Sequence, residues 1–307
     1  MAFTTNISGT AQVDDSVKLA FDQAFLLESA QSNVMDALVN YKVQIGAKSI
    51  QFPKYSQLTL ATTALTEGND LTSEALADSA ILITPAEYGN VVSTTSLASL
   101  QTGGTVDLAA VAAVGQNLSR TKNRLACMAL DASTNVLVAG GKTESTLAGT
   151  DVLSASLLNA AYNKLARKSV GRINGEYVLV AHDDVIADLR DSTGAGSWVD
   201  VTKYATPGAT LTNEVGMFKG FRVIRNNDVT YADQSGAGTV DVYNSYVIGL
   251  NGLGLAESLT PGMVATGPFD KLGRIVNLGW YGVFNYGIVD TDAVWKIQSA
   301  SSLGANA

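Results

Sequence analysis

The only histidine in the chain stands beside two carboxylates, which is the one arrangement in the sequence that could serve general acid or base chemistry. His182 precedes Asp183 and Asp184. A hydrolase would also need a nucleophile held by that base, and no Gly-x-Ser-x-Gly elbow occurs in the sequence. Adjacent side chains seldom point at one reacting atom, so we expect His182 to end a strand and the aspartates to cap a helix. A hydrolase using His182 is kept as a minor alternative.

The other reactive or ligating residues are equally sparse. A single cysteine, Cys127, allows no disulfide within the chain, and one cysteine with one histidine excludes zinc sites of the Cys/His type. Gly249-Leu-Asn-Gly-Leu-Gly lacks the lysine and the following helix of a phosphate-binding loop, so we interpret it as a turn. We therefore predict no catalytic, cofactor-binding or metal site, and a protein that is not an enzyme.

The charged residues are separated along the chain. No Lys or Arg occurs between Lys54 and Arg120, a gap of 65 residues that carries only acidic charges. An acidic, solvated face would explain the gap. The sharper hypothesis is that an acidic segment docks on a basic surface, within the chain or on a neighbouring copy, because charge complementarity selects register and partner. The predicted contact sets Glu67, Asp70, Glu74, Asp78 and Glu87 against Arg120, Lys122, Arg124, Arg167 and Lys168.

The composition indicates a surface that carries few ions. Of 307 residues, 46% are hydrophobic and only 16% are charged, against about 25% charged in ordinary soluble domains. A net charge of −8 argues against a protein that binds DNA by neutralising phosphates. No apolar run is long enough to span a membrane, and the first residues do not resemble a signal peptide, so we expect a cytoplasmic protein. Such a surface suits a protein covered by copies of itself.

Hydrophobic periodicity predicts a helix and then a long β-hairpin in the first third of the chain. After a polar arm over residues 1–13, apolar residues at helical spacing predict a helix from about Val17 to Leu38. Alternating residues over 48–55 and a second β-like run over 80–96 flank a turn-rich segment, which predicts a two-limbed hairpin. This hairpin has too few large apolar residues for a core of its own, so it needs another surface to lie on.

The remainder of the chain is predicted to be mixed α+β. A long helix over about 106–130 follows Gly103-Gly104. Shorter helices are expected over 151–169 and 183–190, the second of them after a strand at 176–181. Further strands are expected at 221–225, 243–250, 274–280 and 283–289. No internal repeat separates these elements.

This order of elements resembles the major capsid proteins of tailed bacteriophages, which have the Hong Kong 97-type fold that encapsulin shells share. Six short sequence segments carry the resemblance. They are Ile50-Gln-Phe-Pro-Lys, Leu65-Thr-Glu-Gly-Asn-Asp-Leu, Glu87-Tyr-Gly, His182-Asp-Asp-Val-Ile-Ala-Asp-Leu-Arg, Phe218-Lys-Gly-Phe-Arg-Val-Ile and Gly279-Trp-Tyr-Gly-Val-Phe-Asn-Tyr-Gly-Ile-Val. An encapsulin-type compartment shell is the alternative within the same fold.

The resemblance implies a division of the chain. Residues 1–45 would be an N-terminal arm and helix, and 46–95 an extended loop lying over an adjacent subunit. Residues 96–131 and 261–307 would form a peripheral domain with a spine helix, and 132–260 an axial domain.

The resemblance also implies partners and an assembly. Copies would form pentamers and hexamers that close into an icosahedral shell around packaged double-stranded DNA, without sequence-specific binding. A separate scaffolding protein, a portal and a decoration protein are implied, with assembly in the host cytoplasm and no membrane. Some relatives cross-link through a lysine of the extended loop, but residues 60–78 contain no lysine.

Overall fold

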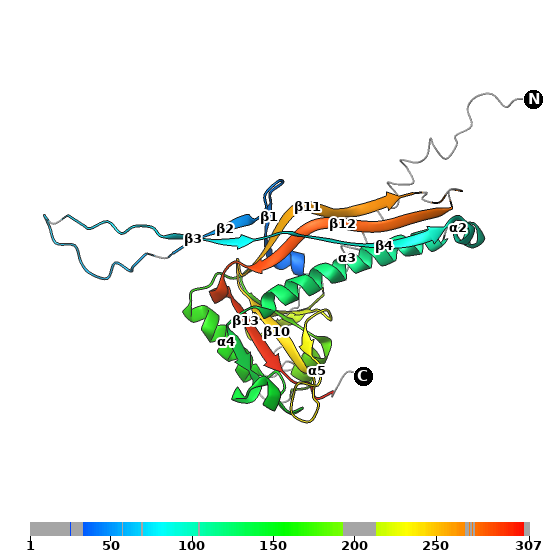
Figure 1. The fold of residues 1–307 in the computed structure, drawn as a ribbon. Coiled ribbons are helices and arrows are strands. Elements are labelled where there is room, and N and C mark those ends of the chain that lie inside the picture. The colour runs from blue at the N-terminus through cyan, green and yellow to red at the C-terminus, as the bar shows by residue number, and fades with distance from the viewer. Residues whose placement is uncertain are drawn as a thin grey trace, which may run out of the picture.

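The computed structural model describes residues 25, 33–56, 58–68, 70–103, 105–192, 213–267, 270, 272 and 274–303. The expected arm over residues 1–13 lies outside these residues, as does most of the helix predicted from Val17. Phe25, inside that predicted helix, is helical and buried. The described elements form an upper sheet with a long helix along it, a lower lobe, and a hairpin that projects from one end (Figure 1).

The upper sheet has four strands in the order β1-β11-β12-β4. β1 is parallel to β11, and the other neighbours are antiparallel. β11 and β12 are both 14 residues long, and β11 carries two bulges between Glu257 and Gly262, around Pro261, which has no N–H to donate to the ladder. The strands are β1 (Val39–Val43), β4 (Ala86–Thr95), β11 (Leu253–Thr266) and β12 (Ile275–Ile288).

The long helix α3 (Thr105–Asp131) confirms the predicted helix over 106–130 and follows the short helix α2 (Ser96–Thr102). Its apolar stripe, with Val111, Val114 and Leu118, packs on the inward side chains of β12, among them Trp280 and Phe284. The same core cluster continues past Cys127 into the lower lobe. The helix therefore joins the two parts of the molecule.

The lower lobe is a seven-stranded sheet ordered β5-β13-β10-β6-β8-β7, with β9 paired to β10. Two helices, α4 (Ala155–Arg167) and α5 (Asp183–Asp191), supply Leu158, Leu165, Val185 and Leu189 to a buried cluster with β6, β8 and β10. The lobe thus has its own core, distinct from the cluster along α3. Its strands are β5 (Val136–Val138), β6 (Tyr177–Ala181), β7 (Glu214–Phe218), β8 (Phe221–Arg225), β9 (Tyr231–Ala232), β10 (Val242–Ile248) and β13 (Val294–Ser299).

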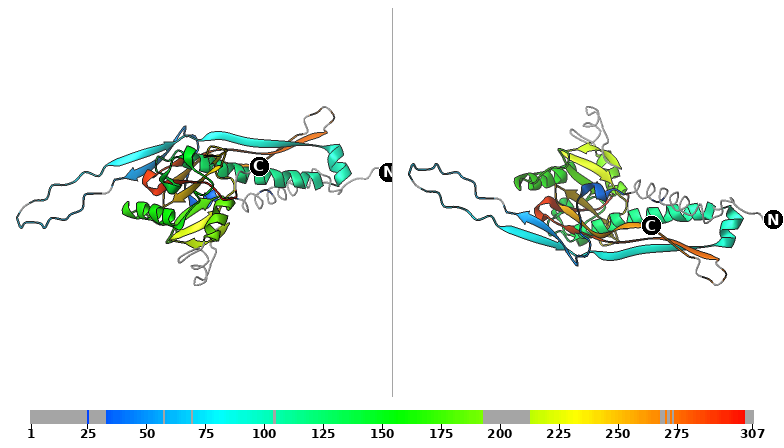
Figure 2. Two further views of the ribbon diagram at one scale, coloured as in Figure 1. Left: turned by 90° about the horizontal axis from the view of Figure 1, so that it is seen from below. Right: turned by 90° about the horizontal axis from the view of Figure 1, so that it is seen from above.

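The hairpin consists of β2 (Ile50–Tyr55), β3 (Asp78–Ile83) and the connection between them, which we name the tip loop (residues 56–77). Ile50, Phe52 and Ile83 pack at its base against Ala256 and Val289 of the body. Beyond that base the tip loop points away from the body, opposite to α2 (Figure 2). Four 3-10 turns complete the described elements, at Met35–Leu38, Ala139–Gly141, Glu144–Thr146 and Thr291–Ala293.

Two predicted elements end differently in the structure. The first predicted helix does not reach Leu38, because the Asn123 side chain accepts the backbone N–H groups of Val34 and Met35 (3.1 and 3.3 Å), and β1 starts at Val39. The second predicted limb, 80–96, splits at Thr84-Pro85: β3 stays in the hairpin, whereas β4 pairs with β12.

Two strands predicted at 274–280 and 283–289 are one strand, β12. Gly282 allows β12 to continue beside Pro261 of β11, because a Cβ on residue 282 would lie only 2.8 Å from that proline. β11 was not predicted, since its glycines, Pro261 and Glu257 look like turn residues in sequence. The expected boundary at 260/261 falls inside β11, and β13 belongs to the lower lobe, so the strands do not divide the chain at the expected positions.

Candidate intersubunit contact residues

The five acidic residues of the predicted contact lie on two different surfaces. Glu67, Asp70 and Glu74 are exposed on the tip loop, and Asp78 is exposed where β3 begins. The Glu74 carboxylate accepts hydrogen bonds from the backbone N–H and the hydroxyl of Thr59 (3.1 and 2.9 Å), which ties the two sides of the loop together.

Glu87 lies instead on β4 in the upper sheet, paired with Val283 of β12. It is close to Tyr281, and partial burial together with this carboxylate raises the pKa of the Tyr281 phenol. Glu87 therefore does not belong to the acidic tip, although the sequence gap includes it.

Lys122 is buried within the subunit, whereas the predicted contact needs it at the surface. Its side chain is 10% exposed, and its Nζ lies 2.8 Å from Asp36 and 3.4 Å from Glu257, which is 2% exposed. Tyr41 and Tyr286 donate to the same two carboxylates at 2.8 and 2.6 Å. Burial, together with these carboxylates, raises the pKa of both phenols, so both stay protonated donors. The sequence showed that Lys122 is charged, but it did not show that the side chain points into the core.

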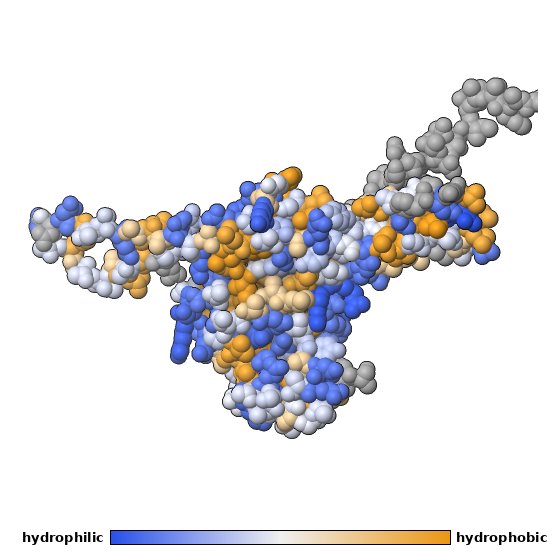
Figure 3. All heavy atoms as spheres, in the orientation of Figure 1, coloured by the Kyte–Doolittle hydropathy of each residue, from blue (hydrophilic) through white to orange (hydrophobic). Residues whose placement is uncertain are grey.

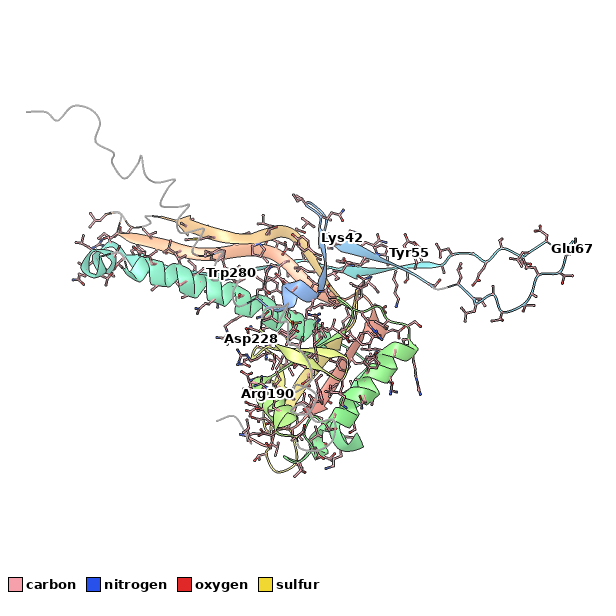
Figure 4. The ribbon with its side chains drawn as sticks, turned by 180° about the vertical axis from the view of Figure 1, so that it is seen from behind. Lys42, Tyr55, Glu67, Arg190, Asp228 and Trp280 are labelled. Atoms are coloured by element: carbon pink, nitrogen blue, oxygen red, sulfur yellow. The ribbon has the colours of Figure 1, made fainter. Side chains whose placement is uncertain are left out.

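Arg120 and Arg124 point to the other side of α3, toward the lower lobe. The Arg120 Nε lies 3.0 Å from Asp228, and the Arg124 guanidinium donates to the backbone carbonyl of Val229 at 2.9 Å. Figure 4 shows Asp228 in the angle between α3 and the lower lobe. These arginines border a groove of about 630 Å³.

Arg167 and Lys168, at the end of α4, border a separate groove of about 680 Å³ with Lys54, Asp290 and Asp292. Lys168 forms an exposed ion pair with Asp292 at 3.3 Å, and Arg167 is exposed. The five basic residues therefore lie in three places. Within the part of the chain that the structure describes, none of the predicted acidic groups forms an ion pair with any of them.

The tip loop also exposes apolar side chains that the sequence reading did not single out. Five leucines of the loop are between 56% and 82% exposed: Leu58, Leu60, Leu65, Leu71 and Leu76. At the opposite end of the molecule Leu97 and Leu100 of α2 are 61% and 81% exposed. Figure 3 shows apolar patches on the hairpin and at the α2 end. The spacing of the leucines over 58–76 could have predicted their exposure, because it fits neither a helix nor a strand with a buried face.

His182 acts as a helix cap. Its Nδ1 accepts the backbone N–H of Asp184 at 3.3 Å at the start of α5, and its ring packs on Tyr243. We predicted a strand-end histidine followed by capping aspartates; the histidine itself is the cap. Cys127 is fully buried, and burial raises the pKa of its thiol well above the ordinary value, which removes it as a nucleophile. Among the described residues, no group of three or more His, Cys, Asp or Glu side chains could hold a metal ion.

A protein-family model described as phage capsid protein matches residues 78–297, which is more than two thirds of the chain. The chain belongs to the phage capsid protein family. It is a structural protein of the phage virion shell, as the resemblance implied, and it is not an enzyme. The hydrolase alternative is therefore wrong, in agreement with the capping role of His182.

Solved structures agree with this assignment at the level of the fold. The capsid of Ralstonia phage GP4 is similar at 16% identity with a TM-score of 0.69, over 86% of this chain and 87% of that one. The capsid protein of cyanophage Pam1 is similar at 10% identity with a TM-score of 0.60, over 98% and 96%. A virus-like particle from Pyrococcus furiosus is similar at 11% identity with a TM-score of 0.57, over 91% and 98%. None of the curated proteins matches this sequence.

No single helix in the described residues is long and apolar enough to cross a membrane; α2 and α3 taken together, bent sharply between them, meet the criterion by length and composition only.

Proposed function

We propose that this chain is a major capsid protein whose copies form pentamers and hexamers that close into an icosahedral head around double-stranded DNA. The observation that carries the proposal is the tip loop. Its leucines are exposed and it has no core of its own, so it needs a surface outside its own chain. A contact between a projecting loop on one copy and a different surface on the next is heterologous, and such contacts build closed rings.

The proposal includes the kinds of subdomain that the family resemblance implies, with the bounds that the strands have in the structure. The upper sheet with α2 and α3 would correspond to the peripheral domain with its spine helix, and the lower lobe to the axial domain. The hairpin β2–β3 would be the extended loop over a neighbouring subunit. A separate scaffolding protein, a portal, a decoration protein and assembly in the host cytoplasm belong to the same proposal.

The charged part of the contact is proposed between the tip loop and the end of α4 on a neighbouring copy. Lys122 is buried, and Arg120 and Arg124 are bound to the lower lobe. Arg167 and Lys168 are exposed at the end of α4, and the ion pair of Lys168 with Asp292 is itself exposed, so we choose these two residues as the basic partners for Glu67, Asp70 and Glu74. Exposed ion pairs contribute only about 0–1 kcal/mol each, so we assign them to register and the leucines to affinity.

Electron microscopy of the expressed protein tests the proposed assembly. Closed shells are expected from the unmodified chain, and DNA-filled heads when it is produced during infection. An encapsulin-type compartment enclosing a protein cargo would contradict the DNA-containing head. A chain that stays monomeric under every assembly condition would contradict the shell of pentamers and hexamers.

A charge exchange tests the docking. Glu67→Lys, Asp70→Lys and Glu74→Lys together should leave the subunit folded but prevent shell formation. Adding Arg167→Glu and Lys168→Glu to that variant should restore shells. Normal shells from the triple variant would exclude a role of these carboxylates, and absence of rescue would exclude Arg167 and Lys168 as their partners.

A further inference from the structure

The dipeptide Asn-Gly occurs twice in the chain, at Asn174-Gly175 and at Asn251-Gly252. An asparagine side chain reacts with its own backbone most readily in this dipeptide, because glycine has no side chain to hinder the approach to its amide nitrogen. Both asparagines lie in turns and have a left-handed backbone, with φ of +51° and +60°. The two sites therefore allow a comparison of different surroundings at the same local sequence.

The first Asn-Gly site is open. Asn174 and Gly175 are the central residues of a two-residue turn between Ile173 and Glu176, and their φ values of +51° and +91° are those of a type I′ turn. Both central residues are exposed, and the position of a Cβ on Gly175 has open space around it. Two backbone hydrogen bonds between Ile173 and Glu176, of 2.9 and 3.2 Å, close the turn. Neither of them uses the Gly175 N–H, so this nitrogen faces solvent.

The second Asn-Gly site is closed in the same respects. Gly252 is buried, and its N–H donates to the carbonyl of Gly249 at 3.2 Å. The Gly252 carbonyl accepts the N–H of Val289 at 3.0 Å. A Cβ on Gly252 would lie 2.9 Å from Val294. The backbone nitrogen that would have to approach the Asn251 side chain is therefore bonded and covered.

We propose that Asn174 is a site of spontaneous deamidation in the folded protein and that Asn251 is protected from it. The Gly175 backbone nitrogen loses its proton and attacks Cγ of Asn174. The bond between this nitrogen and Cγ forms, the Cγ–Nδ2 bond breaks, and Nδ2 leaves as ammonia with the released proton. The product is a five-membered cyclic imide.

Water completes the reaction by opening the imide at one of its two carbonyl carbons. Addition of water at Cγ breaks the new bond to nitrogen and gives aspartate at position 174. Addition at the backbone carbonyl carbon breaks the original peptide bond and leaves the chain running through Cγ, which gives isoaspartate. The reaction consumes one water, releases one ammonia and requires neither an oxidant nor a reductant.

The conformational change that ring closure requires is confined to the turn. The ring forms only after rotation about the Cα–C bond of Asn174, out of the turn conformation. The pairing of Ile173 with Glu176 is an isolated bridge without a ladder beyond its two hydrogen bonds. Exposed turns held by few bonds open locally more often than the whole molecule unfolds. The chain on either side stays in place, because the Tyr177 hydroxyl donates to the Val170 backbone carbonyl at 3.0 Å.

The two products change the turn in different ways. Aspartate keeps the length of the chain and adds a negative charge two residues from Glu176 and from Arg172. Isoaspartate also adds a methylene to the main chain, so a two-residue turn no longer fits between Ile173 and Glu176. The turn leads directly into β6, the strand between β8 and β10. Formation of isoaspartate therefore alters the entry to an inner strand of the lower lobe.

Peptide mass mapping of the unmodified chain tests the proposal. The folded protein is incubated at mildly alkaline pH, and the same chain unfolded in guanidinium chloride is the matched control, because unfolding exposes both dipeptides equally. Both peptides should gain isoaspartate at similar rates in the unfolded chain. In the folded protein the peptide with Asn174 should be converted more than about tenfold faster than the peptide with Asn251, since only the first turn opens locally.

Equal rates at the two sites of the folded protein would overturn the proposal. So would an unconverted Asn174 over the time in which the unfolded chain is converted. The variant Asn174→Asp carries the charge without the added methylene, and its amides of Ile173 and Glu176 should exchange with solvent as slowly as in the parent. The isoaspartate form should exchange faster at both amides, and exchange equal to that of the parent would exclude the predicted opening of the turn.

Discussion

The lower lobe and the tip loop contain similar apolar side chains, but these side chains are buried in the lobe and exposed in the loop. In the lobe, Phe221, Leu158 and Val185 are fully buried between the sheet and helices α4 and α5. In the loop, Leu60 and Leu65 are 82% and 74% exposed. The lobe therefore buries its apolar surface within the chain, whereas the loop can bury its leucines only against a second molecule. Substitutions in the two regions should therefore change different measurements.

Phe221→Ala should give the largest loss of subunit stability. Its ring is fully buried and packs edge-on against Tyr162, with ring centres 5.9 Å apart. Removal leaves a cavity, and we expect a loss of about 3–5 kcal/mol in the free energy of unfolding, measured by urea denaturation. A loss below about 1 kcal/mol would mean that the lobe is not closed as described.

Lys122→Met should cost about 3 kcal/mol, because it removes the cationic partner of the half-buried Asp36 carboxylate and of the buried Glu257 carboxylate. The double variant Lys122→Met with Glu257→Gln should recover part of this loss, since the most buried carboxylate is then neutral. The same denaturation experiment measures both. If Lys122→Met were as stable as the parent but failed to assemble, Lys122 would be an intersubunit residue after all.

Gly220→Ala should cost about 1–2 kcal/mol. Gly220 has a φ of +81°, a conformation that alanine adopts only with strain. A Cβ there would also lie 2.6 Å from the Tyr162 ring, which would have to shift. Gly175→Ala is the control that separates the two causes, because its φ is +91° and no atom lies near its Cβ position. Thermal unfolding should show a larger loss for Gly220→Ala than for Gly175→Ala.

Leu65→Ser and Leu71→Ser should change subunit stability by less than about 0.5 kcal/mol, because both side chains are already exposed. Shell yield measured by electron microscopy should nevertheless fall sharply when both are changed. The polar pair Thr62→Ser and Thr72→Ser in the same loop serves as the control and should leave the yield unchanged. Full shell yield from the double leucine variant would show that shell formation does not require these leucines to pack on another copy.

Elements with a strong period could be predicted from sequence. The stripe through Val111, Val114 and Leu118 predicted α3, and a run of apolar residues between Glu176 and His182 predicted β6. β11 was not predicted, because Pro261 and the glycines of this strand are residues that normally interrupt strands. In the structure Gly282 on the neighbouring strand leaves room for Pro261. The end of the first predicted helix was wrong because the side chain of Asn123, 89 residues from Val34, captures backbone groups that a helix would use.

The candidate contact was predictable in its charge but not in its geometry. The gap without Lys or Arg correctly drew attention to an acidic loop. It included Glu87, which lies in the upper sheet, and it treated the basic residues of α3 as one surface. A helix turns by about 100° per residue, so Lys122 points away from Arg120 and Arg124, which are four residues apart and share one side of the helix.

The class of the molecule could be inferred without coordinates, from the sparse charge, the single histidine and cysteine, and an order of elements typical of phage capsid proteins. The sequence also indicated that the hairpin could not bury itself, because local composition decides how much apolar surface a segment offers. Which charged side chains face inward depends on the folded arrangement of the chain. The burial of Lys122 and the exposure of Arg120 follow from how α3 packs between two sheets, and that packing depends on contacts between residues far apart in the chain.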